Sequence, residues 1–257
     1  PLRAAIEAAR DGADYLILDV PDQEALATIA QAVSDERVLC GSSALAEELP
    51  AVWRTSIPPT ARGELPPRNG AGILCVAGSL TPQTRAQVAY LRALGTPVWT
   101  LQTACLFDDR ARDDQRARLI DALSQRLVSG EDGLLQASSD PAVVARTRAT
   151  GAERGMAPAQ VGRRVSTALA EVVQAVVEGV GVNRLVIAGG DTSAAICARL
   201  GVSGLRVWRE IQPGLPSCLT LEGTPRLLVL KSGSFGSPDF LQQAVTHLKE
   251  QGDRQAT

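Results

Sequence analysis

The sequence predicts an α/β protein in three layers: a mostly parallel sheet with helices on both faces, a mixed or antiparallel edge, and a partial second α/β domain. Three observations predict this fold class. Short apolar runs of strand type alternate with segments of helical spacing along most of the chain. Three late strand-type runs have no helical pattern between them, which indicates the antiparallel edge. A proline-rich segment separates a first, shorter alternation from a second, longer one.

The first alternation occupies residues 1–56. We expect helices at 2–10, 22–33 and 44–49, and buried strands at 15–20 and 37–40. Asp22 has a side chain typical of a helix N-cap. Residues 57–70 then hold four prolines and two glycines, and proline cannot continue a helix or a central strand. We therefore expect a linker at 57–70 and a second domain at 71–257.

The second alternation is longer and more regular. Thr81 and Pro82 are the residue types of an N-cap and a first helical position, and 158–178 carries the strongest apolar stripe. Strands are expected at 73–77, 97–101, 133–137, 184–188, 205–208, 218–221 and 227–230. Helices are expected at 81–94, 113–128, 158–178, 192–200 and 237–248. The segment 138–156 is polar and resists assignment.

Composition excludes several classes of function. A hydrophobic share of 45% is typical of a globular protein with a core, and a net charge of −2 argues against binding nucleic acid or an anionic membrane through bulk charge. His247 is the only histidine, which excludes metal sites built from several histidines. No apolar run reaches the roughly 18 residues of a membrane span. Five widely spaced cysteines without a CxxC motif predict free thiols, so we expect a cytoplasmic location.

Four turns share one design, in which an apolar strand is followed by glycine with serine or threonine and then by a helix start. They begin at Gly41, Gly78, Gly189 and Lys231. In an open α/β sheet, ligands lie outside the carboxyl ends of the strands, where helix N-termini attract anions. Several such turns on one edge predict a polyanion site, although hydroxyl and Asp side chains there also serve simply as helix caps.

Two of these turns supply the most specific candidates. The adjacent Gly189 and Gly190 indicate that something large lies against the backbone. Asp191 fits either a helix N-cap or a ligand of Mg²⁺. Lys231 is one of only two lysines, and it fits either a point charge on a phosphate or a side chain that extends to solvent. Gly214 lies between the two motifs, in a Gln-Pro-Gly-Leu-Pro turn of type II character.

Two common nucleotide motifs are absent from the sequence. Lys231 and Ser232 follow Leu230 rather than the glycine-rich loop of a Walker motif. A GxGxxG pattern that begins at Gly179 has Arg184 in the position of its third glycine. A Walker ATPase and a Rossmann dehydrogenase are therefore disfavoured, and an oxidoreductase is supported only by the α/β alternation.

Four segments in one order resemble the four-carbon acid sugar kinase family. They are AGSLTPQTRAQ (77–87), AGGDTSAAICARLGV (188–202), EIQPGLP (210–216) and LKSGSFGSPDF (230–240). The resemblance covers the chain from about residue 70 and implies the family's C-terminal nucleotide-binding domain at 71–257. GSSALAEEL (41–49) is similar to the end of the family's N-terminal sugar-binding domain, which implies that 1–56 is the last part of that domain.

The resemblance implies ATP- and Mg²⁺-dependent phosphorylation of a hydroxyl on a threonate, erythronate or oxo-tetronate type of sugar acid. The nucleotide-binding residues implied by motif match are Ser79, Gly189, Gly190, Asp191, Thr192 and Gly233. We add Lys231 on physical grounds and Gly214 because its turn lies between the two glycine motifs. Asp191 is the candidate metal ligand.

The catalytic base stays unknown, because the family's acidic Asp-Asp-x-Thr-Gly-Ala motif is not in these 257 residues. We therefore expect this chain alone to bind nucleotide and to transfer phosphate poorly. A non-catalytic α/β module that binds a nucleotide or a phosphorylated metabolite is the alternative. The expected partners are ATP and a small sugar acid, without nucleic acid or membrane; the oligomeric state is open, a homo-oligomer included.

Overall fold

A computed structural model of the chain describes residues 1–53 and 64–251. The first half of the predicted linker, at 57–63, lies outside the described residues. The chain divides into two compact units, Pro1–Arg62 and Gly63–Thr257. None of the helices in the described ranges combines the length and apolar character that a membrane crossing requires.

The described part of the first unit is helical. Its elements are α1 (Leu2–Ala9), the 3₁₀ turn η1 (Arg10–Gly12), α2 (Gln23–Val33) and α3 (Ser43–Trp53). Asp22 caps α2 as predicted, since its carboxylate accepts a hydrogen bond from the Ala25 N–H at 2.8 Å. A small apolar cluster around Ile6, Ile29 and Val33 holds α1 and α2 together.

The strands predicted at 15–20 and 37–40 do not form. Both segments lack regular secondary structure, and Tyr15 and Ile17 are 90% and 93% exposed. A strand needs a neighbour to satisfy its N–H and C=O groups, and the described part of the first unit contains no strand that can pair with either segment. The prediction that these two apolar runs are buried strands is therefore wrong.

Within the described residues, the second unit is built on one seven-stranded sheet. Its strands are β1 (Leu74–Ala77), β2 (Val98–Leu101), β3 (Gly133–Ala137), β4 (Arg184–Ala188), β5 (Leu205–Gln212), β6 (Leu215–Thr220) and β7 (Leu227–Lys231). The spatial order is β2-β3-β1-β4-β7-β6-β5. The first five strands in that order are parallel, and β6 and β5 add antiparallel pairs at one edge, as the sequence predicts.

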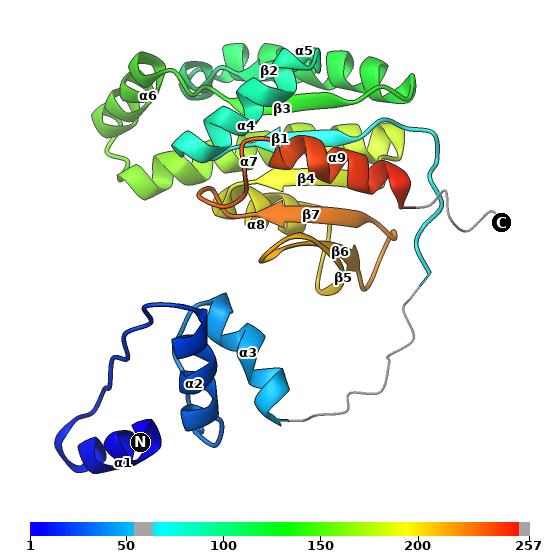
Figure 1. The fold of residues 1–257 in the computed structure, drawn as a ribbon. Coiled ribbons are helices and arrows are strands. Elements are labelled where there is room, and N and C mark those ends of the chain that lie inside the picture. Colours follow the sequence, from blue (N-terminus) through cyan, green and yellow to red (C-terminus); the bar gives the residue numbers. More distant parts are fainter. Residues whose placement is uncertain (54–63, 252–257) are drawn as a thin grey trace. The chain divides into compact units, whose positions relative to one another are not determined.

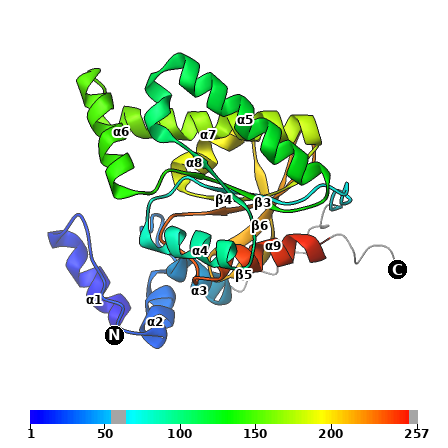
Figure 2. The same ribbon diagram turned by 90° about the horizontal axis from the view of Figure 1, so that it is seen from above.

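Helices cover both faces of this sheet and complete the three layers (Figure 2). The helices are α4 (Pro82–Ala93), α5 (Asp109–Val128), α6 (Pro141–Glu153), α7 (Pro158–Val180), α8 (Gly190–Arg199) and α9 (Phe240–Glu250), with the 3₁₀ turn η2 (Thr103–Phe107) before α5. α4 and α9 pack on one face, and α5, α7 and α8 pack on the other. Side chains along β1 alternate between these two cores, because successive residues of a strand point to opposite faces.

The structure adds detail to two segments, the unassigned 138–156 and the second half of the predicted linker. The polar segment 138–156 contains α6, which Asp140 caps through the N–H groups of Ala142 and Val143. Residues 64–70, the second half of the predicted linker, belong to the second unit and are hydrogen-bonded within it. Arg184 donates to the Pro66 carbonyl at 2.7 Å, and Asn183 donates to the Pro67 carbonyl at 2.9 Å.

Candidate functional site

Three of the predicted turns meet at one edge of the sheet. β1, β4 and β7 are adjacent and parallel, so the turns that begin at Gly78, Gly189 and Ser232 follow the same ends of neighbouring strands (Figure 1). After β1 the chain enters α4 on one face, and after β4 it enters α8 on the other. The junction of β1 and β4 is therefore a topological switch point, where open α/β sheets bind ligands. The turn at Gly41 belongs to the first unit.

Close packing between the three turns requires glycine at several positions. A Cβ on Gly78 would lie 1.9 Å from the Thr192 hydroxyl oxygen, and a Cβ on Gly233 would lie 2.3 Å from the Ser79 hydroxyl oxygen. Gly189 has a φ of +124°, which L side chains rarely adopt. Gly190 differs, because a Cβ there would meet no atom within 4 Å.

The N-terminus of α8 faces the site without a side-chain cap. Gly189 occupies the N-cap position, so the N-cap interpretation of Asp191 is wrong; Asp191 is an exposed residue in the first turn. The first intrahelical bond runs from the Ser193 N–H to the Gly189 carbonyl at 2.8 Å. The N–H groups of Gly190, Asp191 and Thr192 precede it, and such groups together with the helix dipole favour an anion.

α4 holds the loop that follows β7. The Gly233 carbonyl lies within hydrogen-bond distance of three donors: the hydroxyls of Thr81 (2.6 Å) and Thr84 (2.9 Å) and the ammonium of Lys231 (3.0 Å). Gln87 donates from one amide nitrogen to the carbonyls of residues 235–237 at 2.9–3.1 Å. Thr81 also caps α4 through the Thr84 N–H, as predicted. The loop is therefore shaped by the helix that follows the first turn.

Lys231 is buried within this arrangement. Its side chain is 2% exposed, so the interpretation of a lysine extending to solvent is wrong. The ammonium donates to Thr84 and to the Gly233 carbonyl, and no carboxylate in the described parts of the chain pairs with it. Burial without a counter-charge lowers the pKa of Lys231 to about 8. Two of its three N–H donors are used, and contact with a phosphate stays a prediction.

The structure also places Ser79 and Gly214 at this edge. The Ser79 hydroxyl lies 3.1 Å from that of Thr81, beside Gly233. Gly214 has a φ of +73° in the β5–β6 turn, and its N–H donates to the Glu210 carboxylate at 2.8 Å. The Gly214 N–H is therefore hydrogen-bonded within its own hairpin, whereas the Ser79 hydroxyl lies where the three turns meet.

Sequence patterns missed a cavity of about 190 Å³ beside the turns. Gly78, Asp191 and Thr192 form one wall, and the remaining walls come from the end of β3, η2, α6 and the start of α7. A second, more polar cavity of about 440 Å³ lies along α4 between Arg85, Arg92 and Gln136. No motif predicts either cavity, because their residues come from segments far apart in the sequence.

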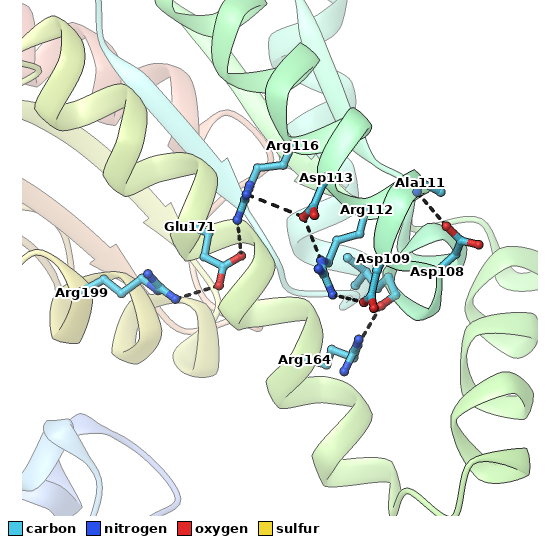
Figure 3. A network of polar contacts seen from close by, with 10 residues as sticks. Asp108, Asp109, Ala111, Arg112, Asp113, Arg116, Arg164, Glu171 and Arg199 are labelled. Atoms are coloured by element: carbon cyan, nitrogen blue, oxygen red, sulfur yellow. Dashed lines mark hydrogen bonds and ion pairs between the residues drawn. The ribbon is translucent and has the colours of Figure 1, made fainter.

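A surface network of ion pairs ties α5, α7 and α8 together (Figure 3). Glu171 on α7 pairs with Arg116 on α5 at 3.6 Å and with Arg199 on α8 at 2.8 Å. Arg116 also lies 3.6 Å from Asp113 within α5. These partly exposed pairs link the far end of α8 to its neighbours, and the uncapped end of α8 stays free for a ligand.

Fold and edge together define the class of protein: an open α/β domain with three glycine-hydroxyl turns at its switch point. The family comparison agrees, since residues 74–241 match the model described as the nucleotide-binding C-terminal domain. Curated relatives include a 3-oxo-tetronate kinase of Cupriavidus necator, 34% identical over 241 residues (93% of this chain and 53% of the relative). A 3-oxo-isoapionate kinase of Paraburkholderia graminis is 32% identical over 243 residues (88% and 50%). The chain belongs to the four-carbon acid sugar kinase family and spans about half the length of these relatives.

Solved structures share the fold. A Salmonella typhimurium LT2 protein superposes with a TM-score of 0.70 at 26% identity, over 95% of this chain and 55% of that one. A Bordetella bronchiseptica protein, solved with bound citrate as a domain-swapped dimer, has a TM-score of 0.59 at 25% identity, over 97% and 56%. Both relatives extend well beyond the segment that this chain matches.

Proposed function

We propose that this chain supplies the nucleotide-binding half of an ATP-dependent kinase, and that the acceptor is a hydroxyl of a four-carbon sugar acid of the oxo-tetronate class. The observation that carries the proposal is the convergence of three glycine-hydroxyl turns on adjacent parallel strands, with the uncapped N-terminus of α8 among them. The names of the curated relatives support the reaction and the class of acceptor.

The residues at the edge fit a polyphosphate. ATP would supply the transferred phosphoryl group. The backbone N–H groups of Gly190, Asp191 and Thr192 would donate to phosphate oxygens, and the Ser79 hydroxyl, which contacts Thr81 in this structure, is a further candidate on the side of β1. Lys231 retains one donor and a positive charge below pH 8, which strengthens the attraction for an anion.

We propose that Mg²⁺ binds at this edge together with the nucleotide, with Asp191 as its candidate protein ligand. Asp191 is exposed in the first turn of α8, and the described residues contain no group of three or more His, Cys, Asp or Glu side chains placed to hold a metal. Mg²⁺ is commonly bound through one or two carboxylates together with phosphate oxygens and waters. Asp191 therefore fits a metal that arrives with the nucleotide, rather than a site formed by protein ligands alone.

We assign residues 1–56 to the end of a sugar-acid-binding domain and 71–257 to the nucleotide-binding domain. The four-carbon acid would then be bound by residues outside the edge described above, and the catalytic base remains unassigned. All five cysteines are free thiols, which supports a reducing compartment, and we propose the cytoplasm.

Calorimetric titration of the chain with ATP and Mg²⁺ tests the proposal. We expect binding with one site per chain, and weaker binding when EDTA removes the metal. Asp191→Asn should abolish most of the gain from Mg²⁺ while it leaves metal-free binding in place, because only the metal contact is lost. A folded chain that shows no heat of binding at millimolar ATP would contradict the proposed function.

A further inference from the structure

The EIQPGLP segment (210–216) has no part in the proposed nucleotide contacts. Gly214, its predicted ligand residue, is exposed, and the Gly214 N–H is bonded to Glu210. The described hydrogen bonds that lead from this segment toward the three turns belong to Gln212, the last residue of β5. Gln212 contacts Ser237 in the connection between β7 and α9, called here the β7–α9 loop (residues 232–237).

The side-chain amide of Gln212 makes three hydrogen bonds. Its oxygen accepts a hydrogen bond from the Ser237 N–H at 3.1 Å. Its nitrogen donates to the Ser237 hydroxyl at 2.6 Å and to the side-chain oxygen of Gln243 on α9 at 3.0 Å. Both N–H donors and the acceptor are therefore used, so the orientation of this amide group is determined by its partners.

Every hydrogen-bonding group of Ser237 has a partner. Its N–H and its hydroxyl oxygen bind Gln212, and its hydroxyl proton is donated to the carboxylate of Asp239. Its carbonyl accepts from the amide of Gln87 on α4 at 2.9 Å. Two glutamines from different elements therefore fix the end of the β7–α9 loop that leads into α9.

The start of the same loop carries Gly233, which is predicted to contact the nucleotide. A Cβ on Gly233 would lie 2.3 Å from the Ser79 hydroxyl oxygen, so this part of the loop lies directly against the first turn. Only residues 234–236 separate Gly233 from Ser237. The contacts with α4 hold the Gly233 carbonyl, whereas the direction of the peptide groups that follow depends on where the loop ends.

We propose that Gln212 is a positioning residue for the nucleotide, and that it acts through Ser237 on the conformation of the β7–α9 loop. The proposal rests on the proposed function, in which the phosphates lie among the three turns. Without the amide of Gln212, the Ser237 N–H loses its acceptor and the loop populates other conformations. The apparent affinity for a ligand falls with the fraction of chains in the binding conformation. The EIQPGLP segment thus serves the nucleotide through Gln212 and not through Gly214.

Three substitutions separate this role from general packing. Methionine is similar to glutamine in size but lacks its amide, so Gln212→Met removes the three hydrogen bonds with little change in volume. Gln242→Met is the matched control, because the described hydrogen bond of Gln242 runs to Thr246 on its own helix α9, at 3.2 Å. Ser237→Ala removes the hydroxyl partner of Gln212 and keeps the backbone N–H.

Calorimetry with ATP and Mg²⁺ compares the variants at a temperature at which urea unfolding shows each of them to be folded. We expect Gln212→Met to weaken ATP binding by about fivefold or more, with Gln242→Met like wild type. Ser237→Ala should weaken ATP binding less, and its effect should be smaller in the Gln212→Met background, where the shared bond is already lost. In the ligand-free Gln212→Met protein, amide chemical shifts should change at residues 232–237 and stay unchanged at residues 190–192.

Wild-type ATP affinity in a folded Gln212→Met protein would overturn the positioning role and leave the proposed function standing. Weaker ATP binding with unchanged amide shifts at 232–237 would also overturn it, because the effect would not pass through the loop. If Gln212→Met does not fold, Ser237→Ala decides, and wild-type ATP affinity in that variant would overturn the role. A folded wild-type chain that binds no ATP would overturn the proposed function and the positioning role with it.

Discussion

Gly190 is the residue at which an effect on ligand binding is most clearly separated from an effect on the free energy of unfolding. It is the first residue of α8, and a Cβ there would meet no atom within 4 Å. Glycine in a helix is about 1 kcal/mol less favourable than alanine, so packing gives no reason for it. We expect Gly190→Ala to leave the free energy of unfolding unchanged, or to raise it by up to about 1 kcal/mol.

The same substitution should weaken nucleotide binding. A methyl group at position 190 would stand between the backbone and a phosphate that lies against it, and so disturb at least one N–H bond to a charged oxygen. Such bonds contribute about 1.5–3 kcal/mol, which corresponds to a loss of roughly 10- to 100-fold in ATP affinity. Calorimetry with ATP and Mg²⁺ measures the affinity, and urea unfolding measures the stability.

Two further glycine variants serve as controls, one for ATP affinity and one for stability. Gly179→Ala introduces the same methyl group on α7 with nothing within 4 Å, and we expect wild-type affinity for ATP. Gly78→Ala would place its Cβ 1.9 Å from the Thr192 hydroxyl oxygen, so it should cost about 1–3 kcal/mol of stability. Wild-type ATP affinity in a folded Gly190→Ala protein would refute the reasoning, since no phosphate would then lie against that residue.

Three other outcomes follow from the contacts near the site. Burial lowers the pKa of Lys231 from 10.5 to about 8, so between these two pH values the unfolded chain binds more protons than the folded one. The free energy of unfolding should therefore rise by about 3 kcal/mol as the pH increases across this window. Urea unfolding at several pH values measures this rise, and Lys231→Met should remove it. Thr84→Val removes a donor to the Gly233 carbonyl and the acceptor of Lys231, and should lower the free energy of unfolding by about 1–3 kcal/mol in urea titrations. Glu171→Gln weakens two exposed ion pairs and should cost less than about 1 kcal/mol, with ATP affinity unchanged by calorimetry.

The parts predicted from sequence are those that depend on local chemistry. Thr81 and Pro82 predicted the start of α4, and the structure confirms both. Several of the four glycine-hydroxyl turns were predicted to share one edge, because parallel strands present their carboxyl ends together, and those that follow β1, β4 and β7 do so. The antiparallel edge followed from three strand-type runs without helices between them, and it too is confirmed.

The parts that were missed depend on contacts between distant segments. Thr84 and Gln87 read as ordinary polar residues of a helix, yet they bind carbonyls of a loop about 150 positions away. The hydroxyls of Thr103 and Thr147 lie in one cavity only because η2 packs against α6. The apolar run at 15–20 predicted a strand, and it fails to form one because a strand depends on a partner that a local pattern does not reveal.

The most direct test of the central claim is an amide chemical-shift titration of the ¹⁵N-labelled chain with ATP and Mg²⁺. The account predicts that the largest shifts fall on the three turns at the edge, at residues 78–79, 190–192 and 232–233, because the proposed phosphate site lies among these residues. Saturable shifts confined to other segments, or no shifts at millimolar ATP, would contradict the claim that this edge binds the nucleotide.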